Sequence, residues 1–409
     1  MLQKVPAHRK ATQPLTLLHN DGTPIQGDVH IEMTKHNFLF GCGAFDAVPL
    51  TQAETSDVER AKYADRLDKW LDLFNFGTLP FYWGRFEPER GKPHTGDLMS
   101  AAKWLAARDV TVKGHPLCWH TVCADWLMEM SNDEILKTQL ARICRDVTGF
   151  AGVIDMWDVI NEVVIMPIFD KYDNGITRIC KDLGRIRMIR EVFEAAREAN
   201  PGATLLLNDF NTSIDYEILI DGCLNAGIPI DAIGIQSHQH QGYWGMEKLQ
   251  VVLKRFAHFG LPIHFTENTL ISGDLMPAHI EDLNDWQVSE WPSTPEGEAR
   301  QAQEISEMYT ALFEHPLVEA ITTWDHTDGN WLGAPSGVLR ADGSTKPAHE
   351  ALYRIIRQDW WTDMTTPANV DGTLRFTGIK GRYRVTAEGK TAEFTLTSDN
   401  DNPLTLRLS

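Results

Sequence analysis

Residues 153–162 read Val-Ile-Asp-Met-Trp-Asp-Val-Ile-Asn-Glu, an apolar run that is typical of a buried strand and that ends in an amide and a carboxylate. A lone Asn161-Glu162 pair in this position is often only the cap of the following helix. A second run, Leu-Pro-Ile-His-Phe-Thr-Glu at residues 261–267, ends in a carboxylate in the same way. Hydrolysis of a glycosidic bond with retention requires two carboxyl groups, one as acid/base and one as nucleophile, and two strand-end glutamates can supply them. We therefore expect Glu162 and Glu267 to form one catalytic pair.

Eight apolar runs of this kind alternate with longer amphipathic segments. The expected strands are Phe38–Gly43, Leu73–Thr78, Val110–Leu117, Val153–Val159, Thr204–Asn208, Ala232–Ser237, Pro262–Thr266 and Val318–Trp324. Helical patterns such as 133–148 and 295–314 lie between them, and each strand-helix unit takes about 30–50 residues. The alternation predicts an α/β fold, a (β/α)8 TIM barrel, in which functional sites form at the carboxyl ends of the strands.

The expected domains are an amino-terminal segment (1–35), the barrel (36–358) and a carboxyl-terminal module of β-strands (359–409). The first segment holds two short strands around an Asn-Asp-Gly-Thr-Pro turn, which predicts a β-hairpin. The last segment has about 50 residues, which is marginal for independent folding. We therefore expect both ends to pack together as one small accessory β module, with structural support and carbohydrate binding as alternative roles.

Composition narrows the range of partners. A formal net charge of −19 argues against nucleic acid and anionic membranes, because phosphate contacts need clustered Lys and Arg. Thirteen tryptophans could stack on sugar rings or fill the core, and six scattered cysteines predict neither a zinc site nor a disulfide framework. Residues 1–10 contain no apolar run, so no signal peptide is expected in this numbering. The compartment stays open, and a monomer is the default expectation.

Six motifs resemble, in order, those of glycoside hydrolase family 10, the retaining β-1,4-xylanase family. They are Gly114–His120, Trp157–Glu162, Leu207–Asn211, Ile233–His238, Phe265–Glu267 and Trp324–Trp331. The resemblance covers residues 36–357. It implies a retaining endo-β-1,4-xylanase that cleaves a plant- or algal-type polysaccharide by double displacement, with no cofactor or metal.

The chemistry required of the two glutamates can be argued without the resemblance. Glu162 must be protonated to give the leaving oxygen its proton, so its pKa must be raised by burial or by a neighbouring carboxylate. Glu267 must be ionised to attack the anomeric carbon. Asn161, beside the acid, can hydrogen-bond the sugar 2-hydroxyl.

The resemblance implies roles for further residues. His120 and Gln236 resemble the binders of the sugar at the cleavage point, Trp324 and Trp331 the aromatic walls around it, His238 the residue that keeps Glu267 ionised, and Asp209 part of the network behind the acid. Taken alone, a His or Trp at a strand end is more often a core residue, and an Asp after a strand is commonly a helix cap. The role of His115 is left open.

One stretch departs from the family pattern. Where these xylanases carry a Glu-Asn pair followed by Lys-Trp, residues 78–88 read Thr-Leu-Pro-Phe-Tyr-Trp-Gly-Arg-Phe-Glu-Pro, without the acid, the amide and the Lys. Lost hydrogen bonds to hydroxyls change specificity more than they change the catalytic step. Phe81, Tyr82 and Trp83 suit stacking on sugar, and Trp83 is a candidate binding residue. A decorated glycan, a non-xylan glycan or an aglycone-bearing glycoside is therefore the alternative substrate.

Two rival functions belong to other classes. A carbohydrate-binding pseudoenzyme is disfavoured by the presence of both Glu162 and Glu267. A metal-dependent barrel hydrolase would use a set such as His115, His120, His238, His240 and Asp209. It is disfavoured because the first barrel strand carries no His-x-His pair.

Overall fold

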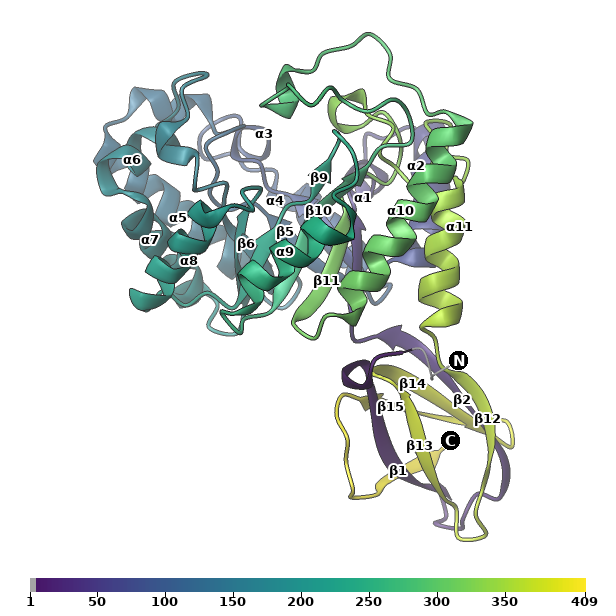
Figure 1. Cartoon of the computed structure of the whole chain (residues 1–409). Helices are drawn as coiled ribbons and strands as arrows, with labels where there is room; N and C mark the ends of the chain where they lie inside the picture. Colours follow the sequence, from purple (N-terminus) through teal and green to yellow (C-terminus); the bar gives the residue numbers. More distant parts are fainter. Residues whose placement is uncertain (1–4) are drawn as a thin grey trace.

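The computed structural model describes residues 5–409 and contains a closed barrel of eight parallel strands (Figure 1). The barrel strands are β3 (Leu39–Gly43), β4 (Phe76–Pro80), β5 (Thr111–His115), β6 (Met156–Asn161), β7 (Thr204–Asp209), β8 (Ala232–Ile235), β10 (Ile263–Leu270) and β11 (Val318–Thr323). Parallel pairing of β11 with β3 closes the ring. The prediction of a (β/α)8 barrel is confirmed, and a short strand β9 (His238–Gln239) pairs with the end of β10.

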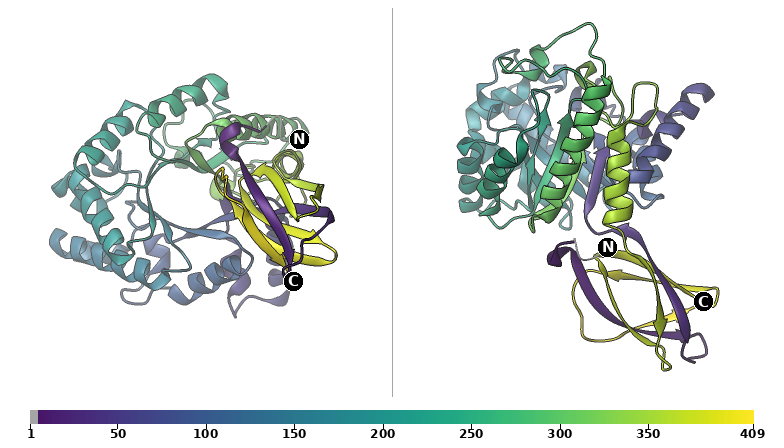
Figure 2. Two further views of the ribbon diagram at one scale, coloured as in Figure 1. Left: turned by 90° about the horizontal axis from the view of Figure 1, so that it is seen from below. Right: turned by 45° about the vertical axis from the view of Figure 1, so that its right-hand side comes forward.

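Helices surround the barrel, as the view along its axis shows (Figure 2). They are α1 (Ala47–Thr51), α2 (Asp57–Leu73), α3 (Trp83–Phe86), α4 (Thr95–Ala106), α5 (Asn132–Phe150), α6 (Gly175–Leu183), α7 (Arg185–Ala199), α8 (Ile214–Asn225), α9 (Gly245–Ala257), α10 (Pro295–Glu314) and α11 (Pro347–Arg354). Short helical turns are η2 (Ala7–Arg9), η3 (Asp125–Glu129), η4 (Met166–Ile168), η5 (Leu283–Asp285), η6 (Trp331–Gly333) and the π-helical η7 (Ile355–Asp359). Helices α2 and α5 begin with capping boxes at Ser56 and Ser131, which satisfy amide groups left free in the first turn.

The barrel core is packed tightly around Trp157. Trp157 on β6 is fully buried and lies against Phe81 and Phe150, with ring centroids 4.9 and 6.2 Å away. On β5, a Cβ atom added to Gly114 would lie 2.1 Å from the Trp157 ring, so only glycine fits there. The Gly-His motif of β5 and the Trp-Asp motif of β6 therefore belong to one packing unit.

The remaining strands form an accessory β module of two sheets. These strands are β1 (Lys10–His19), β2 (Gly27–His36), β12 (Asp363–Ala368), β13 (Thr373–Ile379), β14 (Gly381–Ala387), β15 (Lys390–Leu396) and β16 (Leu404–Leu408). The sheet orders are β13-β1-β16 and β12-β2-β14-β15.

The expected amino-terminal β-hairpin is present only around its turn, whereas the expected packing of both ends of the chain into one β module is confirmed. A tight turn does join β1 and β2, but only Leu18 and Pro24 form a bridge across it, and each strand then enters a different sheet. Turn residues reverse the chain locally, whereas the ladder partners come from the other end of the sequence. Ala11 lies opposite Gly378, for example.

The β module attaches to the amino-terminal end of the barrel strands (Figure 1). Arg9 donates hydrogen bonds to the carbonyl oxygens of Phe313, His315 and Val318, at 2.6–2.8 Å, and Val318 is the first residue of β11. Sites at the carboxyl ends of the strands therefore lie at the opposite end of the barrel from the module. None of the helices in residues 5–409 is both long enough and apolar enough to cross a membrane.

Candidate active site

The two predicted glutamates lie near the carboxyl ends of two barrel strands, Glu162 one residue past β6 and Glu267 three residues before the end of β10. Glu162 directly follows β6 in the left-handed backbone region, with φ of 56°, and its amide donates to the carbonyl oxygen of Asn208 at 2.9 Å. Glu267 lies within β10 and is buried. A left-handed conformation is costly for a residue with a side chain, so the contact with β7 helps to hold Glu162 in place.

The Glu162 carboxyl group has three hydrogen-bond donors. Trp119 Nε1 donates to its Oε2 at 2.9 Å, and Gln236 Nε2 and Asn161 Nδ2 donate to its Oε1 at 3.1 and 3.3 Å. Burial raises the pKa of Glu162 to about 8; the bonds from Gln236 and Trp119 oppose this rise, and the charge of Glu267 adds to it. Glu162 is consequently protonated near neutral pH.

Glu267 has the opposite protonation state. Burial acts to raise its pKa, but His115 and His238 outweigh burial, and the pKa of Glu267 is lowered. His238 Nε2 lies 3.0 Å from Oε2, and Asn208 Nδ2 donates to Oε1 at 2.8 Å. Two neighbouring carboxyl groups with pKa values moved in opposite directions are typical of an acid and a nucleophile.

A chain of buried charged groups lies behind Glu267. Lys113 Nζ is 2.6 Å from Asp158 Oδ2, which also bonds His115 Nδ1 at 2.7 Å. His115 Nε2 faces Glu267 Oε1 at 3.9 Å. All four side chains are at most 5% exposed. The structure thus places His115, whose role the sequence left open, between Asp158 and Glu267.

An amide network links the two glutamates. The Oδ1 atom of Asn161 accepts from Asn208 Nδ2 at 2.8 Å and from Gln236 Nε2 at 3.0 Å. The Nδ2 atom of Asn161 therefore points towards Glu162 and is available to a sugar hydroxyl. Asn208 and Trp119 were not predicted as site residues. The signal for Asn208 was its position at the end of the strand next to β6.

Aromatic side chains line the other side of Glu267. Trp331 lies 4.4 Å from His238 between ring centroids, and Trp324 lies 6.1 Å from His238 and 5.2 Å from His115. The structure thus places both predicted tryptophans against the histidines that flank Glu267.

His120 is buried against Phe169, with ring centroids 4.6 Å apart. Burial lowers the pKa of His120 to about 4, so its imidazole is neutral. The ring of Trp119, which donates to Glu162, lies 6.2 Å from the His120 ring between centroids. His120 thus lies one side chain away from the acid rather than in contact with it.

Asp209 supports the loop that follows Glu162. It accepts from the amides of Val164 and Asn211 at 3.0 and 2.9 Å. Burial raises the pKa of Asp209 to about 7, and its charge adds to the rise at Glu162. Asp209 caps no helix, since α8 begins at Ile214 with Ser213 as its N-cap; its contact with the loop after Glu162 fits the network position instead.

Trp83 does not lie with the other candidates. It is 4% exposed, donates to Glu87 Oε2 at 3.1 Å and packs under the guanidinium of Arg142, 4.9 Å from its ring centroid. Phe81 is fully buried as well. Of the three aromatic residues at this strand end only Tyr82 faces the site, 5.8 Å from the ring of His115. Successive side chains of an extended segment point to opposite sides, so the two neighbours of Tyr82 point into the core. The residue types alone do not reveal which of the three faces the site.

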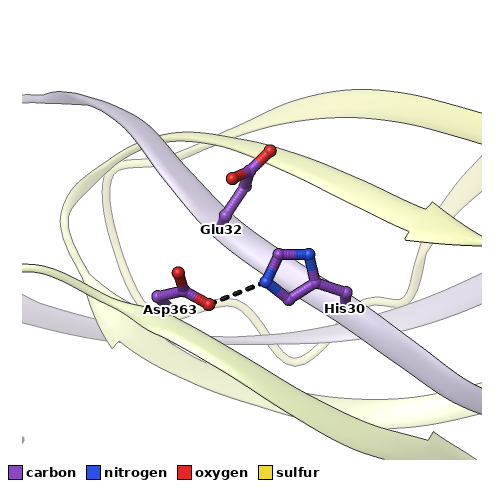
Figure 3. Close-up of side chains that lie close together, drawn as sticks. All are labelled: His30, Glu32 and Asp363. Carbon is purple, nitrogen blue, oxygen red and sulfur yellow. Dashed lines mark hydrogen bonds and ion pairs between the residues drawn. The ribbon is translucent and has the colours of Figure 1, made fainter.

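The residues of the metal-dependent rival do not converge on one point. Within residues 5–409 the only three side chains whose ligand atoms all lie within 4.8 Å are His30, Glu32 and Asp363 in the β module (Figure 3). His30 Nε2 bonds Asp363 at 2.7 Å, and Glu32 is paired with Arg384 at 3.3 Å. This surface group is satisfied by its own ion pairs, and we assign no metal to it.

The sequence is similar to those of curated xylanases. Endo-1,4-beta-xylanase/feruloyl esterase of Xylanibacter ruminicola is 26% identical over 306 residues, which cover 67% of this chain but only 40% of that protein. Endo-1,4-beta-xylanase B of Thermotoga neapolitana is 27% identical over 297 residues, covering 68% of this chain and 78% of that one.

Solved structures share the fold. Xylanase 10B from Thermotoga petrophila, in complex with xylobiose, has a TM-score of 0.63 at 20% identity and covers 79% of this chain and 95% of its own. The family model described as Glycosyl hydrolase family 10 matches residues 79–355, a range that includes Glu162, Glu267 and the amide network between them. The chain belongs to glycosyl hydrolase family 10.

Proposed function

We propose that this protein is a retaining endo-β-1,4-xylanase that hydrolyses a polysaccharide by double displacement, with Glu162 as acid/base and Glu267 as nucleophile. The observation that carries the proposal is the opposite shift of the two pKa values, with Glu162 raised to about 8 and Glu267 lowered. The xylanase names of the relatives support the choice of a xylan substrate.

The first step forms a covalent glycosyl-enzyme. A carboxylate oxygen of Glu267 attacks the anomeric carbon, the bond from that carbon to the leaving oxygen breaks, and Glu162 gives its proton to the leaving oxygen. Asn161 binds the 2-hydroxyl of the sugar through Nδ2, and this bond strengthens as the oxocarbenium-like transition state forms. His238 and Asn208 hold the nucleophile in place.

The second step reverses the roles. The charge of Glu267 has been consumed in the ester, so the pKa of Glu162 falls and its carboxylate takes a proton from water. The water oxygen attacks the anomeric carbon and the bond to Glu267 breaks. The product keeps the β configuration.

The alternative substrate is a decorated or non-xylan β-glycan, or a glycoside with an apolar aglycone. It is favoured by the altered segment at residues 79–83, which lacks the polar binders of the family pattern. We therefore predict a lower kcat/KM on linear xylo-oligosaccharides than on some decorated β-glycan. Three expectations stay predictions: that the protein is a monomer, that the barrel domain spans residues 36–358, and that the β module has a structural role.

The test is digestion of linear xylo-oligosaccharides and a panel of plant and algal polysaccharides, with product lengths resolved and product anomers followed by NMR. A retaining enzyme releases the β-anomer first. Initial release of the α-anomer would remove the nucleophile role from Glu267. Failure to cleave any β-glycan would favour the carbohydrate-binding alternative.

A further inference from the structure

A cavity of about 680 Å³ lies next to the carboxylates, lined by residues 45–52, by the start of α3 and α4, and by the loop after β11. Tyr82 and Trp324 form its inner wall, and both rings lie within 5.8 Å of the His115 ring. Its size lies within the range usual for ligand sites. The cavity can therefore hold a sugar unit attached to the chain being cleaved.

The acidic groups that line this cavity have partners within the protein. Asp46 lies 3.7 Å from Arg66, and Asp97 accepts from Gln52 at 3.1 Å and faces His94 at 3.6 Å. These contacts neutralise the two carboxylates or occupy their oxygens. The buried Asp325 accepts from Ser336 Oγ at 2.6 Å, and burial raises its pKa to about 7.

Arg85, by contrast, has a charge without a partner. Its side chain lines the cavity, and its guanidinium makes no ion pair or hydrogen bond with the part of the chain that the structure describes, residues 5–409. It lies 5.7 Å from the ring centroid of Tyr82, a cation–π contact that holds it on the cavity side of α3. Its donors are free to bind a ligand.

We propose that Arg85 binds an anionic substituent on the glycan, the carboxylate of a uronic acid or a sulfate ester. The guanidinium fork fits planar oxyanions with two parallel hydrogen bonds. The net charge of −19 means that an acidic polymer is not attracted by the protein as a whole, so selectivity has to come from a local cation. This inference rests on the proposed hydrolase function and names the decoration that the altered segment accepts.

The experiment compares two matched pairs of oligosaccharides on one backbone. The first pair carries a uronic acid or its carboxyl-reduced neutral form, and the second carries a sulfate ester or its desulfated form. For the unmodified enzyme we expect about tenfold higher kcat/KM on the anionic member of one pair, the scale of one charge-assisted hydrogen bond. The pair that shows the preference identifies the anion.

Arg85→Gln should abolish this preference and leave the neutral members little affected, because Arg85 is exposed and outside the fold's core. Arg85→Lys keeps the positive charge but loses the two parallel N–H donors of the guanidinium, so this variant should retain part of the preference for the anionic member. The control is Arg90→Gln, since Arg90 lies on the same segment over Trp126, 5.9 Å from its ring centroid, and does not line the cavity. The preference should also weaken at high salt.

Equal kcat/KM within both pairs, or a preference that persists in Arg85→Gln, would overturn the inference and leave the hydrolase proposal intact. If neither member of either pair is cleaved, the polysaccharide panel decides the hydrolase proposal, and Arg85 is tested by binding. Binding is then measured by calorimetry on Glu267→Ala protein. An anionic member that binds about tenfold more tightly, with the preference lost when Arg85→Gln is added, supports Arg85; equal affinities, or a preference that persists, refute it.

Discussion

The indole Nε1 of Trp119 donates a hydrogen bond of 2.9 Å to the Glu162 carboxyl Oε2. This bond favours the ionised form of Glu162, while burial favours the protonated form and prevails, with the pKa at about 8. Trp119 therefore orients the acid and limits how far its pKa rises. The Trp119 ring also contacts the buried, neutral His120 edge-on, with ring centroids 6.2 Å apart.

Trp119→Phe should move the alkaline limb of the kcat/KM profile to higher pH. The unmodified enzyme should lose activity as pH rises through about 8, because Glu162 must be protonated. Removing a donor to the carboxylate raises that pKa further. The matched control is Trp126→Phe, which removes an indole bond of 3.0 Å to the Glu87 carbonyl. A limb that stays in place or moves down would contradict the role of Trp119.

The two glutamates should differ in their response to the leaving group. Glu267→Ala should abolish turnover of every substrate, because no covalent intermediate can form. Glu162→Ala should lose most activity on xylo-oligosaccharides yet retain cleavage of aryl glycosides, whose leaving groups need no proton. Steady-state rates on both substrate classes provide the measurement. Equal loss on aryl glycosides shows that the roles are misassigned, and the reverse pattern exchanges them.

Asn208→Asp should move the acidic limb to higher pH. Asn208 Nδ2 donates to Glu267 Oε1 at 2.8 Å, and a carboxylate in its place would repel the ionised nucleophile and raise its pKa. The change keeps the bond that Asn208 Oδ1 accepts from Thr266 at 2.6 Å. The exposed Asn225→Asp on α8 serves as control. The pH dependence of kcat/KM measures the effect, and an unaltered acidic limb would argue against Asn208 as a positioning residue.

Glu162→Gln should raise thermal stability at alkaline pH. The folded-state pKa of about 8 is above the ordinary value near 4.3, so the stability from the protonated form is complete below about 4.3 and is lost as pH rises towards 8. Gln has no charge to bury over that range. Melting temperatures should be similar near pH 4, and the variant should be higher by a few degrees near pH 8. The exposed Glu129→Gln should show no such divergence.

Trp83→Ala should reduce stability rather than change substrate choice. The indole is buried against Arg142 and Trp126, and truncation of a core Trp costs about 3–5 kcal/mol. Tyr82→Ala, by contrast, should lower kcat/KM with a smaller effect on unfolding, because Tyr82 faces the His115 ring. Thermal unfolding and kinetics of the two variants separate the roles. A stable Trp83→Ala protein with altered KM would restore Trp83 to the binding site.

The barrel could be predicted from the sequence because most of its strands contain a short apolar run, such as Leu205–Leu207 in β7, and helical patterns lie between them. Strand ends also predicted where Glu162 and Glu267 would meet. The position of Trp83 could not be predicted, since the direction of a side chain just after a strand depends on how the backbone turns. The sequence predicted that the two ends of the chain pack together, but not which C-terminal strands pair with β1 and which with β2, because pairing between residues far apart in sequence leaves no local pattern.

The pairing within the β module sets the order in which the chain can fold during synthesis. β1 and β2 are synthesised before the barrel, yet their ladders need residues 363–408, which are synthesised after it. The barrel strands between them can find their neighbours earlier. Throughout translation, therefore, two ten-residue strands have unpaired edges and are open to association with other nascent chains. Closure of the module is the late, high-contact-order event, and refolding yield should fall with protein concentration for this reason.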